Sequence, residues 1–233
     1  DIKQAIAIQD LPIYTQLEGD IHYLKQDYNS ALASYKKVNE SNIRSASTIF
    51  TEAKTLEMLE TPAEEVLVLM DSCVAQFNKP YSADAAPYLI ERARVRMEAK
   101  QARNAVLDYD ECYAALLGNV NDGFYNLRGQ ACLESKQYQR ALDDFTKAIE
   151  LNPRELTYYS ELAYVNMRVG RNQEAIDVLK KSLKIDAEYA EGYRLIGVAY
   201  LQLKQNAEAC EYFNKAKELG DTNVDTLIEK YCK

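Results

Sequence analysis

The chain has 233 residues, of which 36 are acidic and 28 basic, giving a formal net charge of −8. This acidic balance argues against a nucleic-acid partner, because phosphate backbones are bound by clustered positive charge. The longest apolar tract, Val66 to Met70, is far shorter than the roughly 18 residues that a membrane-spanning helix needs. We therefore expect a soluble protein with no nucleic-acid ligand and no direct membrane span.

The first third of the chain contains two helical hairpins with irregular spacing. Gly19, Ala31 and Tyr35 mark one hairpin that begins near Pro12. Residues 46–77 predict a second hairpin, broken at 61–62, in which two registers fit. Either Ala63 or Glu65 takes the place that Ala31 holds in the first hairpin.

A cluster of turn-forming residues, 78–84, precedes a third hairpin that starts near Ala86. The cluster is compatible both with a kink and with an ordinary loop between repeats. We predict degenerate hairpins over residues 1–85, a regular array of about four units over 86–221 and a capping helix over 222–233. One continuous superhelix is the favoured arrangement, since stacked repeats need no single central core.

From Asp122 onward the sequence nearly repeats itself every 34 residues. Three stretches that begin near Asp122, Leu156 and Ala190 align without a gap. A period of this size indicates one supersecondary unit stacked on copies of itself. Equivalent positions hold the same kinds of residue: Tyr125, Tyr159 and Tyr193; Gly129, Ala163 and Gly197; Ala141, Ala175 and Ala209; Phe145, Leu179 and Phe213.

Each repeat predicts two antiparallel helices, because its apolar residues recur at helical spacing on two stripes separated by a short polar break. The small residues, such as Gly129 and Ala141, fall where the two helices press together. After the last repeat, Val224, Leu227 and Ile228 form a stripe that is typical of a capping helix. The chain thus predicts about six helix pairs and a cap.

The pattern over residues 122–221 resembles the tetratricopeptide repeat, with departures such as Ala187 in place of a proline and Cys132 and Asn166 in place of a tyrosine. The resemblance implies an all-α, right-handed α-solenoid whose first helices line a concave groove. Members of the family that it resembles hold an extended peptide or a partner's helix in this groove. The candidate groove residues are Arg94, Asn126, Gln130, Ser160, Tyr164, Arg168, Arg194 and Val198.

These groove residues suggest how a peptide would be held. Asn126 and Gln130 have side-chain amides that both donate and accept hydrogen bonds, as a peptide backbone requires. Arg94, Arg168 or Arg194 would hold a carboxylate through two parallel hydrogen bonds. The alternative is that the same residues are solvated side chains of a face that binds nothing.

Co-chaperones of the family capture the acidic C-terminus of Hsp70 or Hsp90 with a clamp of lysine, asparagine and arginine side chains. The matching places here hold Asn126, Gln130, Glu161, Glu191 and Leu195. Two carboxylates stand where the clamp needs cations. We therefore expect a partner protein or peptide other than a chaperone tail.

Catalysis and cofactor binding find no support in the sequence. His22 is the only histidine, which excludes a zinc site built on two histidines. No phosphate-binding, dinucleotide-binding or nucleophile-elbow motif occurs. We expect no catalytic residue, no metal and no cofactor, and we interpret two charged clusters, Arg92 to Arg96 and Asp108 to Glu111, as solvated helix faces.

Five cysteines occur in odd number and without a CxxC spacing, so most are expected to be small buried apolar residues rather than paired ones. Mostly reduced thiols favour a reducing compartment. The start at Asp1 rather than Met points the other way, toward a trimmed N-terminal segment such as a signal peptide. Cytoplasmic and periplasmic locations both stay open.

Three functional hypotheses follow. The first is a non-catalytic scaffold that binds a partner in the concave groove. The second is a structural or self-association arm of a larger assembly, which would use the convex side or the terminal faces. The third is an envelope-associated recognition protein whose anchor has been removed.

Overall fold

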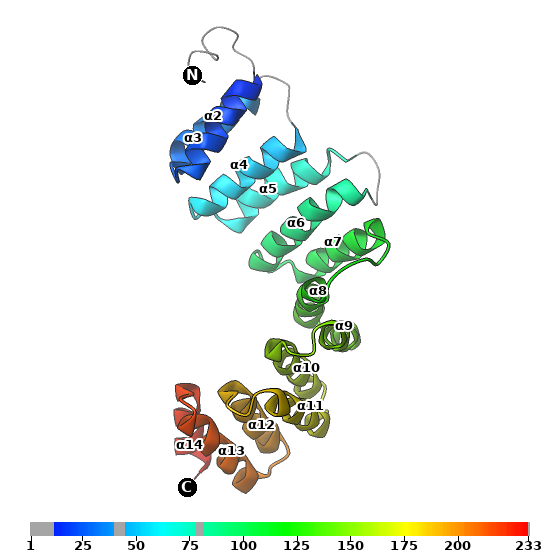
Figure 1. The fold of residues 1–233 in the computed structure, drawn as a ribbon, viewed down its shortest axis with the longest axis vertical. Coiled ribbons are helices and arrows are strands. Elements are labelled where there is room, and N and C mark those ends of the chain that lie inside the picture. The colour runs from blue at the N-terminus through cyan, green and yellow to red at the C-terminus, as the bar shows by residue number, and fades with distance from the viewer. Residues whose placement is uncertain (1–11, 40–44, 78–81, 233) are drawn as a thin grey trace. The chain divides into compact units, whose positions relative to one another are not determined.

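The computed structural model describes residues 12–39, 45–77 and 82–232. Within these ranges the chain is all-α, and its helices follow one another as six pairs and a final short helix (Figure 1). The six pairs and the cap confirm the prediction. The pairs are α2 (Pro12–Leu24) with α3 (Tyr28–Asn39), α4 (Ala46–Met58) with α5 (Ala63–Val74), α6 (Ala86–Glu98) with α7 (Ala102–Ala115), α8 (Asp122–Glu134) with α9 (Tyr138–Leu151), α10 (Leu156–Arg168) with α11 (Asn172–Ile185), and α12 (Ala190–Gln202) with α13 (Asn206–Glu218). The cap is α14 (Asp225–Tyr231), and two 3-10 helices, η1 (Ala83–Ala85) and η2 (Thr222–Val224), precede α6 and α14.

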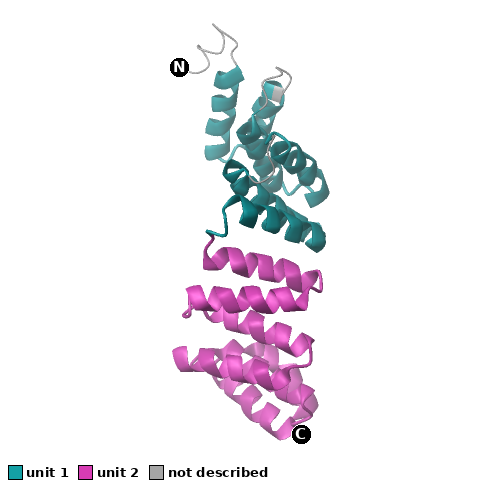
Figure 2. Ribbon diagram, turned by 90° about the vertical axis from the view of Figure 1, so that its right-hand side faces the viewer, with its two compact units in different colours: residues 1–119 teal, residues 120–233 magenta. Residues whose placement is uncertain are grey.

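The chain divides into two compact units, residues 1–119 and 120–233 (Figure 2). Unit 1 contains α2 to α7, and unit 2 contains α8 to α14. The boundary that we expect after residue 85 stays a prediction. Within the turn-forming cluster, residues 78–81 lie outside the described residues, and residues 83–85 form η1.

Each helix pair is held together by a small residue in its first helix that faces a large side chain of its second. In three pairs the small residue is glycine and an aromatic ring fills the space of the missing side chain. A Cβ built on Gly197 would lie 2.5 Å from Cε1 of Phe213, and one on Gly129 would lie 2.9 Å from Cε1 of Phe145. Both rings are fully buried. The predicted close approach of the two helices is confirmed, and at Gly129 and Gly197 the ring leaves no room for a Cβ.

The second helix pair shows why its register was ambiguous. The fourth residue of each second helix is a buried alanine in the other five pairs, from Ala31 in α3 to Ala209 in α13. In α5 this position holds Val66, which is 1 % exposed. Both expected registers, with Ala63 or with Glu65 at this place, are therefore wrong. Met70 and Cys73, both fully buried, take the next two core positions of the same stripe.

Buried arginine–aspartate pairs join the helices of two successive pairs. In unit 1, Arg92 of α6 donates from Nε and Nη2 to Asp108 of α7, at 3.2 and 2.6 Å, and Arg96 donates to the same carboxylate. In unit 2, Arg128 of α8 makes the same bidentate contact with Asp144 of α9, at 2.9 and 2.7 Å. The side chain of Asp108 is only 2 % exposed. The expectation of solvated charged faces is therefore wrong for Arg92, Arg96 and Asp108.

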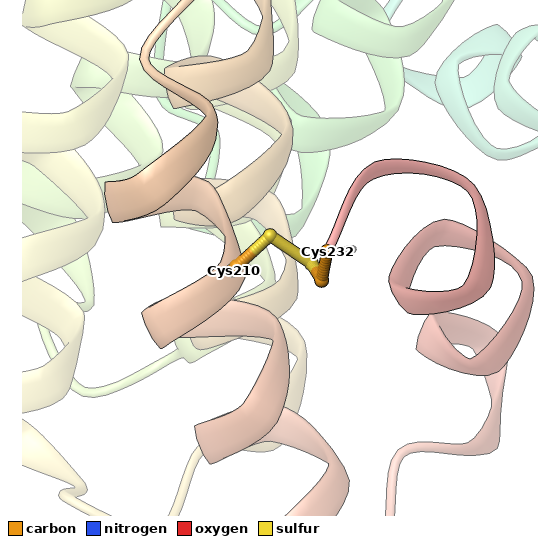
Figure 3. Close-up of a disulfide and its surroundings, with 2 residues drawn as sticks. All are labelled: Cys210 and Cys232. Atoms are coloured by element: carbon orange, nitrogen blue, oxygen red, sulfur yellow. A yellow bond between two sulfur atoms is a disulfide. The ribbon is translucent and has the colours of Figure 1, made fainter.

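The cysteines divide into two groups. Cys73, Cys112 and Cys132 are free and buried, as expected of small apolar residues. Cys210 of α13 and Cys232, which follows α14, form a disulfide (Figure 3). The expectation of unpaired cysteines is therefore wrong for these two residues. The bond supplements apolar contacts of Val224, Leu227 and Ile228 with α13, so that α14 covers the last hydrophobic face of unit 2.

We expect the closest helix contact to tolerate no added methyl group. Gly197→Ala should lower the free energy of unfolding by about 1–3 kcal/mol, because the new Cβ meets the buried ring of Phe213 and the backbone oxygen of Ala209. Gly123→Ala is the matched control, since its Cβ would approach the nearest neighbouring atom no closer than 3.6 Å. Urea titration monitored by circular dichroism measures both, and equal stabilities of the two variants would contradict this interpretation.

The disulfide should contribute measurably to the stability of unit 2. Because Cys210 and Cys232 are 22 residues apart, opening the bond releases a loop whose entropy corresponds to about 3 kcal/mol. We expect Cys210→Ser/Cys232→Ser to lower the melting temperature in calorimetry. Reductant should lower the melting temperature of the natural chain and leave that of the double variant unchanged; an equal response of both would show that the bond does not stabilise the fold.

Candidate functional site

The first helices of unit 2 form a common face. In addition to packing on its partner, α10 contacts both α8 and α12, whereas the second helices pack mainly on their neighbours in sequence. First helices that lie closer together than second helices belong on the inside of a curved stack. Six predicted groove residues occupy equivalent places there, at the fifth and ninth positions of each helix: Asn126 and Gln130 on α8, Ser160 and Tyr164 on α10, Arg194 and Val198 on α12.

A hollow of about 290 Å³ opens on this face between the three first helices. Ser160 and Tyr164, both predicted, line it, and the ring of Tyr164 is 43 % exposed. The remaining lining residues were not among the predicted site residues. They are Leu133 of α8, Thr157 and Glu161 of α10, and Glu191 and Leu195 of α12.

Some polar side chains of this face are hydrogen-bonded within the chain, and one has an atom without a partner. Gln130 donates from Nε2 to Oε1 of Glu161 at 3.1 Å, which links α8 to α10. The hydroxyl oxygens of Ser160 and Tyr189 lie 2.7 Å apart. The Oδ1 atom of Asn126 is buried and has no hydrogen-bond partner among the described residues. A buried acceptor without a donor is costly, so this atom is an unsatisfied polar group of α8.

The predicted arginines are less available than the sequence suggests. Arg94 lies in unit 1, where its guanidinium contacts the carboxylates of Glu57, Glu91 and Glu98. Arg194 donates to Asp221 at 2.8 Å and to Glu191 at 3.0 Å. An incoming carboxylate would have to displace these internal partners.

The last two predicted residues differ in exposure. Arg168, at the end of α10, is exposed, and among the described residues it makes two long hydrogen bonds of 3.5 Å, to the hydroxyls of Tyr138 and Tyr164. Val198 is half-buried and packs against the apolar clusters on both sides of α12. Val198 therefore contributes more to packing than to a free surface.

A second hollow, of about 430 Å³, lies at the start of α12 and is mostly polar. Its walls come from the first two turns of α12, from the segment between α13 and η2, and from η2 itself. Arg194 and Asp221 bond to each other within it, so its main charges are already paired. Glu191 lines both hollows.

Glu161 is the electrostatically unusual group of the first hollow. Burial raises the pKa of its carboxyl, the amide of Gln130 lowers it in part, and the negative charge of Glu191 raises it further. Glu161 has no ion-pair partner among the described residues. The sequence contained one signal: none of the residues three or four positions away from Glu161 on its helix is basic.

The raised pKa predicts how stability depends on pH. The folded chain binds the proton of Glu161 more tightly than the unfolded chain, so this group destabilises the fold increasingly as pH rises above the usual glutamate range. Glu161→Gln keeps an oxygen for Gln130 and removes the charge. We expect the variant to melt at a higher temperature than the natural chain at pH 7 and at the same temperature near pH 3.5. A variant that is less stable at pH 7 would contradict the assignment.

Comparison with known proteins identifies the family of the repeats. Models described as tetratricopeptide repeat match residues 124–155 and 190–219, and a TPR repeat model matches residues 168–204. The solved structure of YrrB, a TPR protein with an unusual peptide-binding site, superposes with a TM-score of 0.64 at 19 % identity, covering 84 % of this chain and 97 % of that one. The chain is a tetratricopeptide repeat protein. The all-α solenoid predicted from the sequence is confirmed.

Two curated relatives of this tetratricopeptide repeat protein illustrate the range of its matches. The BBSome complex member BBS4 of Bos taurus is 27 % identical over 222 residues, which are 94 % of this chain and 41 % of the relative. Heat shock protein STI1 of Saccharomyces cerevisiae is 31 % identical over 102 residues, 42 % of this chain and 17 % of the relative. The chain spans less than half the length of the curated relatives that it matches. Tetratricopeptide repeat proteins typically mediate protein–protein interaction.

The comparisons do not support our exclusion of a chaperone tail. A heat shock protein and a DnaJ homolog are among the similar proteins. The exclusion was based on which residue types stand at the clamp positions, and the structure shows two of these residues, Gln130 and Glu161, bonded to each other. An acidic chaperone tail therefore belongs among the ligands to be tested.

None of the helices in the described residues is long and apolar enough to cross a membrane. The same part of the chain contains no group of three His, Cys, Asp or Glu side chains placed to hold a metal ion.

Proposed function

We propose that unit 2 is a non-catalytic interaction module that binds an extended segment of a partner protein across the face of α8, α10 and α12. The observation that carries the proposal is the hollow of about 290 Å³ to which all three first helices contribute. No single repeat can form such a site. Its occurrence therefore depends on the stacking that defines the solenoid.

The chemistry of this face supports an extended peptide. Leu133, Tyr164 and Leu195 offer apolar surface for a side chain. Gln130 and Asn126 lie on the neighbouring helix, and their side-chain amides can both donate and accept hydrogen bonds, as a peptide backbone requires. Apolar pockets with a few polar groups beside them are the usual form of a recognition site.

The other two hypotheses stay predictions. No feature of the described residues indicates the cellular compartment, so none favours an envelope-associated recognition protein. A self-association arm would use the convex side or a terminal face, and at the terminal face of α14 Leu227 and Ile228 pack on α13 within the cap. Charges at these two positions would disturb the fold and would therefore not test association.

The proposal can be tested by selecting phage-displayed random twelve-residue peptides on the immobilised full chain. The selected peptides are synthesised and titrated by fluorescence anisotropy. We expect Asn126→Ala/Tyr164→Ala to weaken their binding at least about tenfold, which corresponds to roughly 1.4 kcal/mol. The control, Gln173→Ala/Lys181→Ala, changes two exposed residues of the second helix α11 and should bind as the natural chain does. Failure to select any peptide, or equal binding by all three proteins, would refute the proposal.

A further inference from the structure

The hollow between α8, α10 and α12 combines an apolar wall with negative charge. Leu133, Tyr164 and Leu195 form the wall, and the carboxylates of Glu161 and Glu191 face the same space from two different helices. The sequence suggested the opposite arrangement of charge, in which arginines of the groove hold a carboxylate of the ligand. The contacts of each charged group show whether the site would bind a cationic or an anionic ligand.

The guanidinium of Arg194, on α12, already has two internal carboxylate partners. Arg194 is bonded to Asp221 through Nε and to Glu191 through Nη2, so one guanidinium serves two carboxylates. The side chain of Asp221 is only 7 % exposed, which fixes this arrangement. Glu191 also accepts a hydrogen bond from the hydroxyl of Tyr189 at 3.0 Å.

Glu161 has no such compensation. Its Oε1 accepts from the neutral amide of Gln130, and the described residues supply no cation to either oxygen. The carboxylate is half-buried beside apolar side chains, where a charge is less well solvated than in water. Glu161 and Glu191 line this hollow, and Asp221 and Arg194 line the second hollow, which shares Glu191 with it. The two linings together contain three carboxylates and one guanidinium, so their net charge is negative.

We propose that this hollow binds the side chain of a lysine or arginine from an extended segment of a partner protein. The cationic group lies between Glu161 and Glu191, and the aliphatic stem lies along Leu133, Tyr164 and Leu195. Long basic side chains suit such a place because they combine an apolar stem with a charged end. Hydrogen bonds between ionised groups are also stronger than those between neutral ones. This inference rests on the proposed function, since it identifies what the same face recognises.

The charge of the whole chain agrees with a basic ligand. A net charge of −8 attracts cationic segments at long range and speeds their association, an effect that salt weakens. A metal ion is a poorer occupant, because only two carboxylates line the hollow and the described residues offer no group of three ligands. The observations therefore favour a basic side chain.

The test uses the full chain and the peptide selection described above. We expect the selected peptides to be enriched in lysine or arginine with apolar neighbours. Glu161→Gln should weaken their binding at least about tenfold. Glu211→Gln, which removes an exposed carboxylate from α13 outside the hollow, should bind as the natural chain does. Loss of binding by unfolding is excluded by the thermal melt of Glu161→Gln, which is expected to be no less stable than the natural chain.

A double-mutant cycle identifies the contact itself. Replacing the basic residue of the peptide by norleucine should weaken binding to the natural chain about tenfold and binding to Glu161→Gln by much less. Equal losses against both proteins would overturn the inference. So would selected peptides that lack basic residues or are acidic at their C-terminus, although their loss of binding to Asn126→Ala/Tyr164→Ala would leave the proposed function standing. If no peptide is selected, both proposals fail.

Discussion

The close contact between a small residue of each first helix and a large side chain of each second helix is the constraint on which the other features depend. Where the ring of Phe213 occupies the space beside Gly197, the two helix axes are held at one separation and one register. The same contact, between residues sixteen apart in the chain, joins Gly129 to Phe145 and Gly19 to Tyr35. Because every pair has nearly the same internal geometry, stacked pairs present their first helices on one face. The candidate hollow is a product of that regularity.

A second layer of interaction is electrostatic and less regular. The buried pairs Arg92–Asp108 and Arg128–Asp144 cross equivalent helix contacts, and both are bidentate. Buried pairs of this kind contribute little net stability, but losing one partner leaves an uncompensated charge. They make certain helix contacts intolerant of change without altering the exposed face. In contrast, Glu161 is a half-buried carboxylate to which the described residues supply an amide but no cation, so its charge destabilises the fold.

Much of the fold could be predicted from the sequence because a 34-residue period depends on residue types that recur. The prediction failed where a different residue fills the same volume: Val66 for alanine and Met70 for an aromatic ring preserve burial but hide the register of α5. The candidate site was only partly predictable. The positions of Ser160 and Tyr164 follow from helical spacing. Whether Arg194 is free to bind a ligand depends on its hydrogen bond to Asp221, twenty-seven residues later, and this bond forms only when η2 folds back toward α12. Pairing of Cys210 with Cys232 depends on the same return of the chain.

The disulfide has a consequence for how unit 2 opens. In a stack held by nearest-neighbour contacts, local unfolding starts at an end, where a helix has a neighbour on one side only. Cys210 and Cys232 covalently join α13 to the segment after α14, so the end helix cannot detach by itself (Figure 3). Opening from this end must instead involve α13 and its partner α12, which carries Glu191 and Leu195. Because this larger opening breaks more contacts, amide protons of α12 should exchange more slowly in the natural chain than in Cys210→Ser/Cys232→Ser.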